Sequence, residues 1–454
     1  MLSANVLEFE RVKVGRMLSK DLCSLTLPGS KSYTNRALVM AALSSGETLI
    51  TGISPSDDSN VLLTALRRIG VACSEQPNNS ILVSGLPTAL PTSHVIKIDV
   101  GAAGTSMRFL VGLLASLPGV VTEISGSERM HQRPIADLVN ALRQLGAKIE
   151  YTGTAGCPPL RIEGQHLTCQ QPISISGKTS SQFISALLMI APRVHGGLQL
   201  KIEGELVSKS YLNMTIASMR EFGVAVKNEQ YQTLTVGADS AYSCSKYHVE
   251  GDASGASYFW ALAALSGRPV RVCNLKANSA QGDVNFPMLL ARMGCAVTFS
   301  SKNAGPAPED NWIQVTRGKR LIAINADMEL MPDTAQTLAM VAAFSEGDSK
   351  ITGLQTLRVK ETDRLLALVT EFSKLGIKAE AGDDWLNIEG NYSERSLDLD
   401  NVIDTYEDHR MAMSYAILSA THGPLIINKP AVVSKSYPNF WVELAKIGVP
   451  LECA

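Results

Sequence analysis

The chain has 454 residues, of which 45% are apolar and 19% are charged. A length of 454 residues favours two or more domains, or one large one, and these proportions supply a sizeable hydrophobic core and exclude a chain that is disordered throughout. Because 41 Lys and Arg residues nearly balance 43 Asp and Glu residues, the formal net charge is only -2, which argues against a nucleic-acid-binding protein with a broad basic face. An anionic ligand must instead meet a local cluster of positive charge.

Eight cysteines are spaced singly, and no two form a C-x-x-C pair. The sequence therefore predicts neither a thiolate zinc site nor a disulfide framework. Residues 1–20 mix acidic and basic side chains without an apolar run, and the apolar stretch 183–191 is far shorter than the roughly 20 residues that span a bilayer. We therefore expect a reduced, cytoplasmic protein.

A helix that ends at a glycine and leads into a strand is predicted six times along the chain. The copies lie at 62–75, 138–151, 215–228, 289–300, 368–381 and 442–453, and their glycines are Gly70, Gly146, Gly223, Gly294, Gly376 and Gly448, separated by 76, 77, 71, 82 and 72 residues. Glycine adopts the left-handed backbone that ends a helix at little cost. The residues after each glycine alternate as a half-buried strand does.

A second series of six helices is interleaved with the first. Each begins in a polar segment and continues as a nearly all-apolar helix, which predicts burial; the segments are 30–43, 104–115, 179–191, 252–265, 333–344 and 407–420. A unit of roughly 75 residues with two helices and several strands is thus copied six times in an α/β fold. Chance recurrence is the simpler alternative, but two interleaved series disfavour it. A parallel Rossmann sheet would need a G-x-G-x-x-G after its first strand, and the chain has none.

The polar segments place hydroxyl side chains and cations at the predicted helix starts. Ser and Thr at such positions commonly cap the helix, which is the simpler interpretation of each one. Cations there are opposed by the helix dipole, so their presence indicates bound anions; they are Lys31, Arg36, Arg108, His409 and Arg410. Two further cations, Arg129 and Arg133, precede a helix that Pro134 is predicted to open.

Lys360 and Arg364 are four residues apart, which predicts that they share one helix face with a negative group between them. A surface ion pair between Glu361 and Arg364 is the alternative.

The segment 176–181, SGKTSS, is similar to the end of a P-loop, but residue 172 is Pro where that motif has Gly. The sequence therefore does not support binding of ATP or GTP.

Ten motifs in chain order resemble the signatures of the 5-enolpyruvylshikimate-3-phosphate synthase family. They are LPGSKSYTNRA, GAAGTSMRF, SERMHQRPI, KTSSQF, LVSKSY, GDASGAS, QGDVNF, MPDTAQT, RVKETDRL and TYEDHRMAM. The resemblance implies a two-domain inside-out α/β barrel built from six βαβαββ repeats, three per domain. One domain would comprise residues 1–29 and 251–454 and the other residues 30–250, with the active site in the cleft between them.

The resemblance also implies an enzyme that transfers the enolpyruvyl group of phosphoenolpyruvate to the 5-hydroxyl of shikimate 3-phosphate and releases phosphate. The reaction proceeds by addition and elimination through a tetrahedral intermediate, on the route to aromatic amino acids. No cofactor or metal is implied, and no nucleic-acid or membrane partner. We expect a monomer whose partners are these two small molecules.

The roles of individual residues follow from the resemblance alone. Asp333 would be the base for the 5-hydroxyl, Glu361 the acid at the enol methylene, and Lys31 would assist the departure of phosphate. Shikimate 3-phosphate would be bound by Lys31, Ser32, Arg36, Ser180, Ser181, Gln182, Ser208, Tyr211, Asp333, Thr356 and Lys360. Phosphoenolpyruvate would be bound by Lys31, Gly104, Arg129, Gln182, Arg364, His409, Arg410 and Lys435.

Three residues depart from the family pattern: Ala102 and Thr356 stand where Asn is usual, and Glu407 stands where Asn or Asp is commoner. Gly104 leaves room beside the phosphoenolpyruvate site, from which we hypothesise sensitivity to glyphosate.

One alternative to this function is that of the related enolpyruvyl transferase that acts on UDP-N-acetylglucosamine. That family typically uses a loop cysteine, and residues 119–133 contain none. Another is a non-catalytic repeat scaffold, which would need an exposed apolar surface for its partner.

Overall fold

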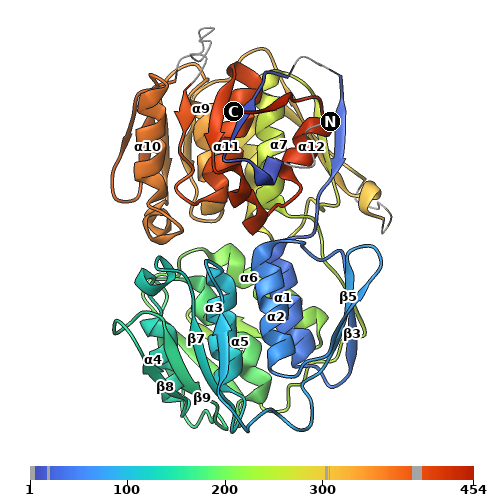
Figure 1. Cartoon of the computed structure of the whole chain (residues 1–454), viewed down its shortest axis with the longest axis vertical. Helices are drawn as coiled ribbons and strands as arrows, with labels where there is room; N and C mark the ends of the chain where they lie inside the picture. The colour runs from blue at the N-terminus through green and yellow to red at the C-terminus, as the bar shows by residue number, and fades with distance from the viewer. Residues whose placement is uncertain (1–5, 18–20, 302–304, 306, 391–400) are drawn as a thin grey trace. The chain divides into compact units, whose positions relative to one another are not determined.

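The computed structural model describes residues 6–17, 21–301, 305, 307–390 and 401–454. The chain divides into two compact units: unit 1 comprises residues 1–28 and 250–454, and unit 2 comprises residues 29–249. The chain therefore starts in unit 1, builds all of unit 2 and then returns to unit 1, as the colours in Figure 1 show. Within the described residues, no helix is both long enough and apolar enough to cross a membrane.

Unit 2, all of whose residues are described, contains three four-stranded sheets with strand orders β14-β3-β5-β4, β6-β7-β9-β8 and β10-β11-β13-β12. Its strands are β3 (Glu47–Thr51), β4 (Cys73–Gln76), β5 (Ser80–Ser84), β6 (Ile96–Asp99), β7 (Val121–Ser125), β8 (Lys148–Tyr151), β9 (Leu160–Glu163), β10 (Ile173–Ser176), β11 (Leu198–Glu203), β12 (Lys227–Glu229), β13 (Thr233–Val236) and β14 (Lys246–His248). Its α-helices are α1 (Lys31–Ala42), α2 (Asp57–Arg68), α3 (Gly104–Ala115), α4 (Ala136–Gln144), α5 (Ser181–Ile190) and α6 (Lys209–Glu221).

The described part of unit 1 also contains three four-stranded sheets, with strand orders β16-β17-β15-β2, β18-β19-β21-β20 and β22-β23-β1-β24. Its strands are β1 (Arg11–Val14), β2 (Cys23–Thr26), β15 (Val270–Cys273), β16 (Cys295–Phe299), β17 (Trp312–Arg317), β18 (Asn325–Asp327), β19 (Ser349–Thr352), β20 (Ala379–Ala381), β21 (Leu386–Ile388), β22 (Val402–Ile403), β23 (Leu425–Asn428) and β24 (Leu451–Cys453). Its α-helices are α7 (Ala253–Ser266), α8 (Phe286–Arg292), α9 (Ala335–Ala342), α10 (Arg364–Lys374), α11 (His409–His422) and α12 (Phe440–Lys446).

Each sheet has the same pairing pattern, which confirms the predicted sixfold repeat. In the sheet of β6 to β9, β6 pairs parallel with β7, β7 pairs antiparallel with β9, and β9 pairs antiparallel with β8. This is the βαβαββ unit, with α3 between the first two strands and α4 after the second. Three sheets take a strand from a distant part of the chain: β2 pairs with β15, β1 with β23, and β14 with β3.

The glycines that end the predicted helices have the expected backbone conformation. Their φ angles are positive, from 67° at Gly376 to 102° at Gly294, and all six precede a strand. A side chain at such a position would strain the backbone, so the glycine stops the helix and turns the chain into the sheet.

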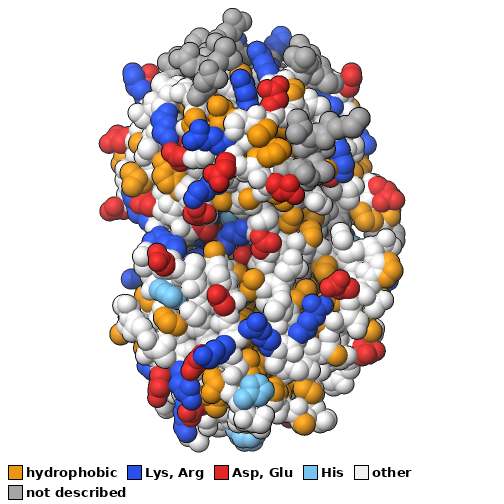
Figure 2. Space-filling model, viewed as in Figure 1, with side chains coloured by type: hydrophobic (Ala, Val, Ile, Leu, Met, Phe, Trp, Pro, Cys, Tyr) orange, Lys and Arg blue, Asp and Glu red, His pale blue; other side chains and the backbone are white. Residues whose placement is uncertain are grey.

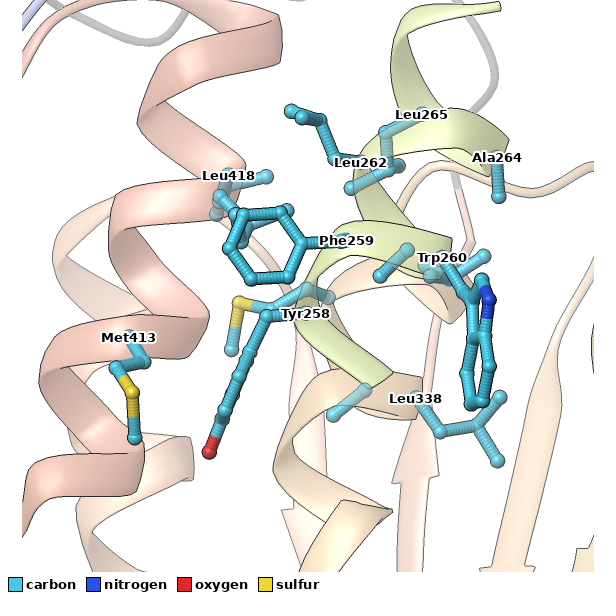
Figure 3. Packing of buried hydrophobic residues seen from close by; sticks show 14 of the residues in the cluster. Tyr258, Phe259, Trp260, Leu262, Ala264, Leu265, Leu338, Met413 and Leu418 are labelled. Carbon is cyan, nitrogen blue, oxygen red and sulfur yellow. The ribbon is translucent and has the colours of Figure 1, made fainter. Parts of the chain in front are cut away.

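The helices α3 in unit 2 and α9 in unit 1 are buried at every residue, and α7 and α11 in unit 1 are nearly so. In unit 1, Phe259 and Trp260 of α7 pack with Leu338 of α9 and Leu418 of α11 in one hydrophobic core (Figure 3). Strands such as β11 bury alternate residues, so one face of each sheet covers the helices and the other is exposed. Charges of both signs are mixed over the face drawn in Figure 2.

Candidate active site

The predicted site residues fall into two groups, one in each unit. Unit 1 holds Asp333, Thr356, Lys360, Glu361, Arg364, His409, Arg410 and Lys435. Unit 2 holds Lys31, Ser32, Arg36, Gly104, Arg129, Ser180, Ser181, Gln182, Ser208 and Tyr211.

In unit 1, the carboxylate of Asp333 is surrounded by three cations. Its Oδ1 accepts from Arg364 Nη1 at 3.0 Å and lies 3.4 Å from Lys360 Nζ. Its Oδ2 accepts from Arg410 Nη2 at 2.9 Å. The side chain of Asp333 is only 16% exposed, so these attractions are weakly screened and stabilise the ionised carboxylate.

Arg364 joins this carboxylate to two others. Its Nη2 donates to Glu361 Oε2 at 2.9 Å and its Nε to Asp408 Oδ2 at 2.7 Å, while Glu361 Oε1 lies 3.4 Å from Lys435 Nζ. Burial opposes the charge of the guanidinium, but Asp408, Glu361 and Asp333 outweigh it and raise the pKa of Arg364 above its ordinary value. We call these seven residues the charge cluster: Asp333, Lys360, Glu361, Arg364, Asp408, Arg410 and Lys435.

The charge cluster forms where several short helices begin or end. Asp333 lies in the 3-10 helix η6 (Pro332–Thr334) just before α9, Lys360 follows η7 (Gln355–Val359), and Lys435 ends η8 (Pro430–Lys435). Arg364 is the first residue of α10. Arg410 is the second residue of α11, where the Asp408 side chain accepts from its backbone N–H and caps the helix.

Two sequence-based interpretations of this region are corrected. Lys360 does not share a helix face with Arg364, because α10 starts only at Arg364; the negative group between the two cations is Asp333 of the protein itself. The pair of Glu361 with Arg364 exists but is not a surface pair, since the two side chains are 12% and 1% exposed. Asp333 itself lies within η6, and the N-cap of α9 is Thr334.

His409 and Thr356 lie near the same helix starts. His409 is buried, with Nδ1 3.6 Å from Asp408 Oδ1. The hydroxyl of Thr356, in η7, is buried without a hydrogen-bond partner among the described residues. An unpaired buried hydroxyl is costly, which suits a contact with a bound molecule.

Asp283 is an acid near the cluster that the sequence-based site did not include. It lies in η4 (Gly282–Asn285), is 5% exposed and accepts a hydrogen bond from the Ser254 hydroxyl at the start of α7. Burial and the negative charge of Asp333 raise the pKa of Asp283 to about 7, against the opposing effects of Ser254 and Arg410. The QGDVNF motif was the only signal for it in the sequence.

In unit 2, two cations of the first motif occupy different environments. Lys31 Nζ lies 3.1 Å from Asp58 Oδ2. Arg36 is 1% exposed and donates to Thr215 Oγ1 at 2.8 Å, to the Ser32 carbonyl at 2.9 Å and to the Tyr211 carbonyl at 3.0 Å. Within the described residues no carboxylate lies at ion-pair distance from Arg36, and burial lowers its pKa to about 10.

The remaining residues of unit 2 lie at the starts of α3, α5 and α6. Ser180 caps α5 by accepting from the Gln182 backbone N–H at 3.2 Å, which confirms the capping interpretation for this serine; Ser181 begins the helix. The Gln182 amide in turn donates to Thr105 Oγ1 at 3.3 Å, which links the starts of α5 and α3. Ser208, at the start of α6, has a positive φ of 55° and no capping hydrogen bond from its side chain.

Arg133 lies at the start of α3, whereas Arg129 precedes the 3-10 helix η2 (Met130–Gln132), and the two arginines differ in exposure. Arg129 is half-buried and donates to Gln132 Oε1 at 3.1 Å. Arg133 is 9% exposed, and its Nη1 lies only 2.5 Å from the position that a Cβ on Gly104 would take. The helix that Pro134 was predicted to open starts at Ala136.

Over the described residues, no group of three or more His, Cys, Asp or Glu side chains is arranged to hold a metal ion. The ionisable groups of the two units thus form two kinds of site. Unit 1 places acids and bases around a buried arginine. Unit 2 directs helix starts and cations at positions that suit anionic groups.

Comparison with known proteins agrees with the ten motifs. Residues 19–444 match the family model described as EPSP synthase (3-phosphoshikimate 1-carboxyvinyltransferase). The chain is 42% identical over 427 residues to the 3-phosphoshikimate 1-carboxyvinyltransferase of Bordetella bronchiseptica, covering 92% of this chain and 93% of that protein, and 41% identical over 436 residues to that of Paraburkholderia phymatum, covering 94% and 97%.

A solved structure of EPSP synthase from Acinetobacter baumannii superposes with a TM-score of 0.79 at 26% sequence identity, covering 97% of this chain and 99% of that one. The likeness extends over the whole fold and agrees with the two-domain α/β architecture expected from the repeats. The chain belongs to the EPSP synthase family.

Proposed function

We propose that this protein is a 3-phosphoshikimate 1-carboxyvinyltransferase, which transfers the enolpyruvyl group of phosphoenolpyruvate to the 5-hydroxyl of shikimate 3-phosphate and releases phosphate. The observation that carries the proposal is the charge cluster, in which Asp333 and Glu361 both contact Arg364 but have different other partners. Two carboxyl groups in different environments can act as base and acid in one reaction. The reaction belongs to the biosynthesis of aromatic amino acids.

The reaction needs one proton removed and one supplied in each of its two steps. In the addition, the 5-hydroxyl oxygen bonds to C2 of phosphoenolpyruvate, its proton passes to Asp333, and C3 gains a proton from Glu361. In the elimination, the bond from C2 to the phosphate oxygen breaks, a methyl proton returns to Glu361 and the double bond re-forms, while the departing phosphate takes up the proton that Asp333 had removed. Lys31 assists the departure of phosphate by offsetting its charge.

Substrate binding would itself activate Asp333. Arg364, Arg410 and Lys435 are the cations of unit 1 that we assign to phosphoenolpyruvate, and His409 lies beside them. The carboxylate and phosphate of the substrate compete with Asp333 for Arg364 and Arg410. Weaker attraction to Arg364 and Arg410 raises the affinity of the carboxylate for a proton, so that Asp333 becomes a better base when the substrate is bound.

The shikimate 3-phosphate site is assigned to the helix starts of unit 2 together with Lys360 and Thr356. Arg36 supports this assignment, because a buried guanidinium without a carboxylate partner favours the arrival of an anion. The phosphate and the ring of shikimate 3-phosphate would also be contacted by Ser180, Ser181, Ser208, Gln182 and Tyr211. Phosphoenolpyruvate would be bound in unit 2 by Lys31, Gln182, Gly104 and Arg129.

We further propose that the two units are the two domains of a monomeric enzyme, and that glyphosate inhibits it. The mass in solution, measured by light scattering, tests the monomer. If glyphosate at a concentration well above that of phosphoenolpyruvate leaves turnover unaltered, the proposed inhibition is contradicted.

The test of the activity is release of inorganic phosphate with both substrates, and with each omitted in turn. Release that requires both supports the assignment, and release without shikimate 3-phosphate contradicts it. Asp333→Asn and Glu361→Gln should each lower turnover roughly 100-fold or more, the usual effect of losing a general base or acid. Asp348→Asn makes the same change at an exposed acid of unit 1 and should leave turnover unchanged. Near-normal turnover in the double variant would exclude the assigned roles.

A further inference from the structure

Among the described residues, Arg133 is a buried cation without a partner. The residue is 9% exposed, its Nε is buried, and the described residues provide its side chain with neither a hydrogen bond nor an ion pair. Burying a guanidinium costs free energy unless its charge and its N–H groups are satisfied. The protein therefore maintains an unfavourable arrangement at this position, which a bound anion would relieve.

The guanidinium of Arg133 lies at the N-terminus of α3. A Cβ on Gly104, the first residue of that helix, would lie 2.5 Å from Arg133 Nη1 and 2.9 Å from its Cζ. The absence of a side chain at Gly104 is therefore what allows the guanidinium to approach the helix start. Both features are in unit 2, so their juxtaposition does not depend on unit 1.

The N-terminus of α3 is also without a cap. The N-cap residue is Ala103, which has no side-chain acceptor, and the backbone N–H groups of Gly104 and Thr105 have no acceptor among the described residues. The helix is 12 residues long, so its dipole adds positive potential at this end. Donors from the backbone and from Arg133 thus face the same space.

The neighbouring arginines are occupied by other contacts. Arg108 Nη1 donates to the Gly104 carbonyl at 3.0 Å and its Nη2 to the Pro134 carbonyl at 3.3 Å. Arg129 donates to Gln132 and is more exposed. Arg133 is the arginine of this group whose donors remain available within the described residues.

We propose that Arg133 is a further substrate-binding residue, which holds one anionic group of phosphoenolpyruvate together with the backbone N–H groups at the start of α3. The inference rests on the proposed function and adds a residue to that site. A guanidinium beside two backbone donors can hold either a carboxylate or a phosphate in a fixed orientation.

The test compares Arg133→Gln and Arg133→Lys with the wild type. Arg143→Gln is the matched control, because it removes the same charge from unit 2 at the opposite end of α4, where the guanidinium contacts the Ile149 carbonyl. Binding of inorganic phosphate and of pyruvate is measured separately by calorimetry, which distinguishes the phosphate from the carboxylate. Nitrogen NMR of the arginine side chains reports directly whether the Arg133 signal shifts with either probe.

Arg133→Gln should weaken the binding of one probe, and raise the KM for phosphoenolpyruvate, roughly 10- to 100-fold, the range for a hydrogen bond to a charged group. Arg133→Lys should recover part of this loss, since the charge remains. Arg143→Gln should bind as the wild type does. Unchanged affinity in Arg133→Gln with an unmoved NMR signal in the wild type overturns the proposal, even if Arg133→Gln melts at a lower temperature.

The outcomes for Arg133 and for the reaction are separable. If the wild type releases phosphate from both substrates but Arg133→Gln has an unaltered KM, the role of Arg133 falls and the proposed function stands. If the wild type is inactive but its Arg133 signal shifts with phosphate or pyruvate, the anion site stands and the proposed function falls.

Discussion

Asp283 should make unit 1 less stable as the pH rises, and its replacement by Asn should remove this dependence. The pKa of Asp283 in the folded protein is about 7, whereas that of an unfolded Asp is about 3.9. Between these values the folded state binds the proton more tightly than the unfolded state does. Stability therefore falls as the pH rises from about 4 to about 7, and the cost is fully present above pH 7.

The size of the effect follows from the difference between the two pKa values. At 1.36 kcal/mol for each pKa unit, about three units correspond to about 4 kcal/mol, which we take as an upper bound. Asn keeps an oxygen that can accept from Ser254, so Asp283→Asn should lose little at pH 4.5. At pH 8 it should be more stable than the wild type by roughly 1–3 kcal/mol, which raises the melting temperature of a domain of this size by several degrees.

The assay is thermal and urea unfolding of the wild type and Asp283→Asn from pH 4.5 to 8.5. Asp348→Asn, at an exposed acid of the same unit, controls for the general effect of removing one negative charge. A stability gain that is equal at both ends of the pH range, or a loss at pH 8, would refute the reasoning.

Three further substitutions test single features of the structure. Both polar atoms of the Gln336 amide are buried in α9 without a hydrogen-bond partner among the described residues. Gln336→Met should therefore raise the urea midpoint by an amount equivalent to about 1–3 kcal/mol of unfolding free energy. A lower midpoint contradicts this reasoning. Glu407 has a φ of 55°, a conformation that Asn tolerates better than Glu does. Glu407→Asn should therefore gain about 0.5–1 kcal/mol of stability in the same assay, although the exposed ion pair with Lys429 is lost. Unchanged stability would count against backbone strain at this residue. Gly104→Ala should push the flexible ends of both Arg133 and Arg108 aside, raising the KM for phosphoenolpyruvate roughly tenfold with little change in melting temperature; an unaltered KM would mean that neither guanidinium has a part there.

The sixfold repeat could be predicted because its signals are local. A glycine that stops a helix and the period of apolar residues act within about 15 residues, and all six copies appear in the structure. The pairing of β1 with β23 could not be predicted in this way, since the partners are separated by most of the chain. No pattern within either strand identifies the other.

The charge cluster was only partly predictable, for a related reason. Motifs identified Asp333, Glu361 and Arg364 as chemically important, but two of the protein's own counterions, Asp408 and Asp58, were missed. Asp408 contacts Arg364 across 44 residues of sequence, and Asp58 contacts Lys31 across 27. A cation at a helix start suggests an anion, but the sequence alone does not distinguish a substrate from a side chain that arrives from another helix.

The order of strands in the sheets determines when each unit can fold during synthesis and how the chain can be circularly permuted. Unit 2 can complete every sheet once residue 249 has left the ribosome, whereas β1 and β2 must wait for β15, β23 and β24, made much later. Since β1 lies between β23 and β24, with Val12 opposite Cys453, the first and the last strand of the chain are neighbours in one sheet. A circular permutant that joins these ends and opens between residues 249 and 250 would make each unit a continuous stretch of polypeptide.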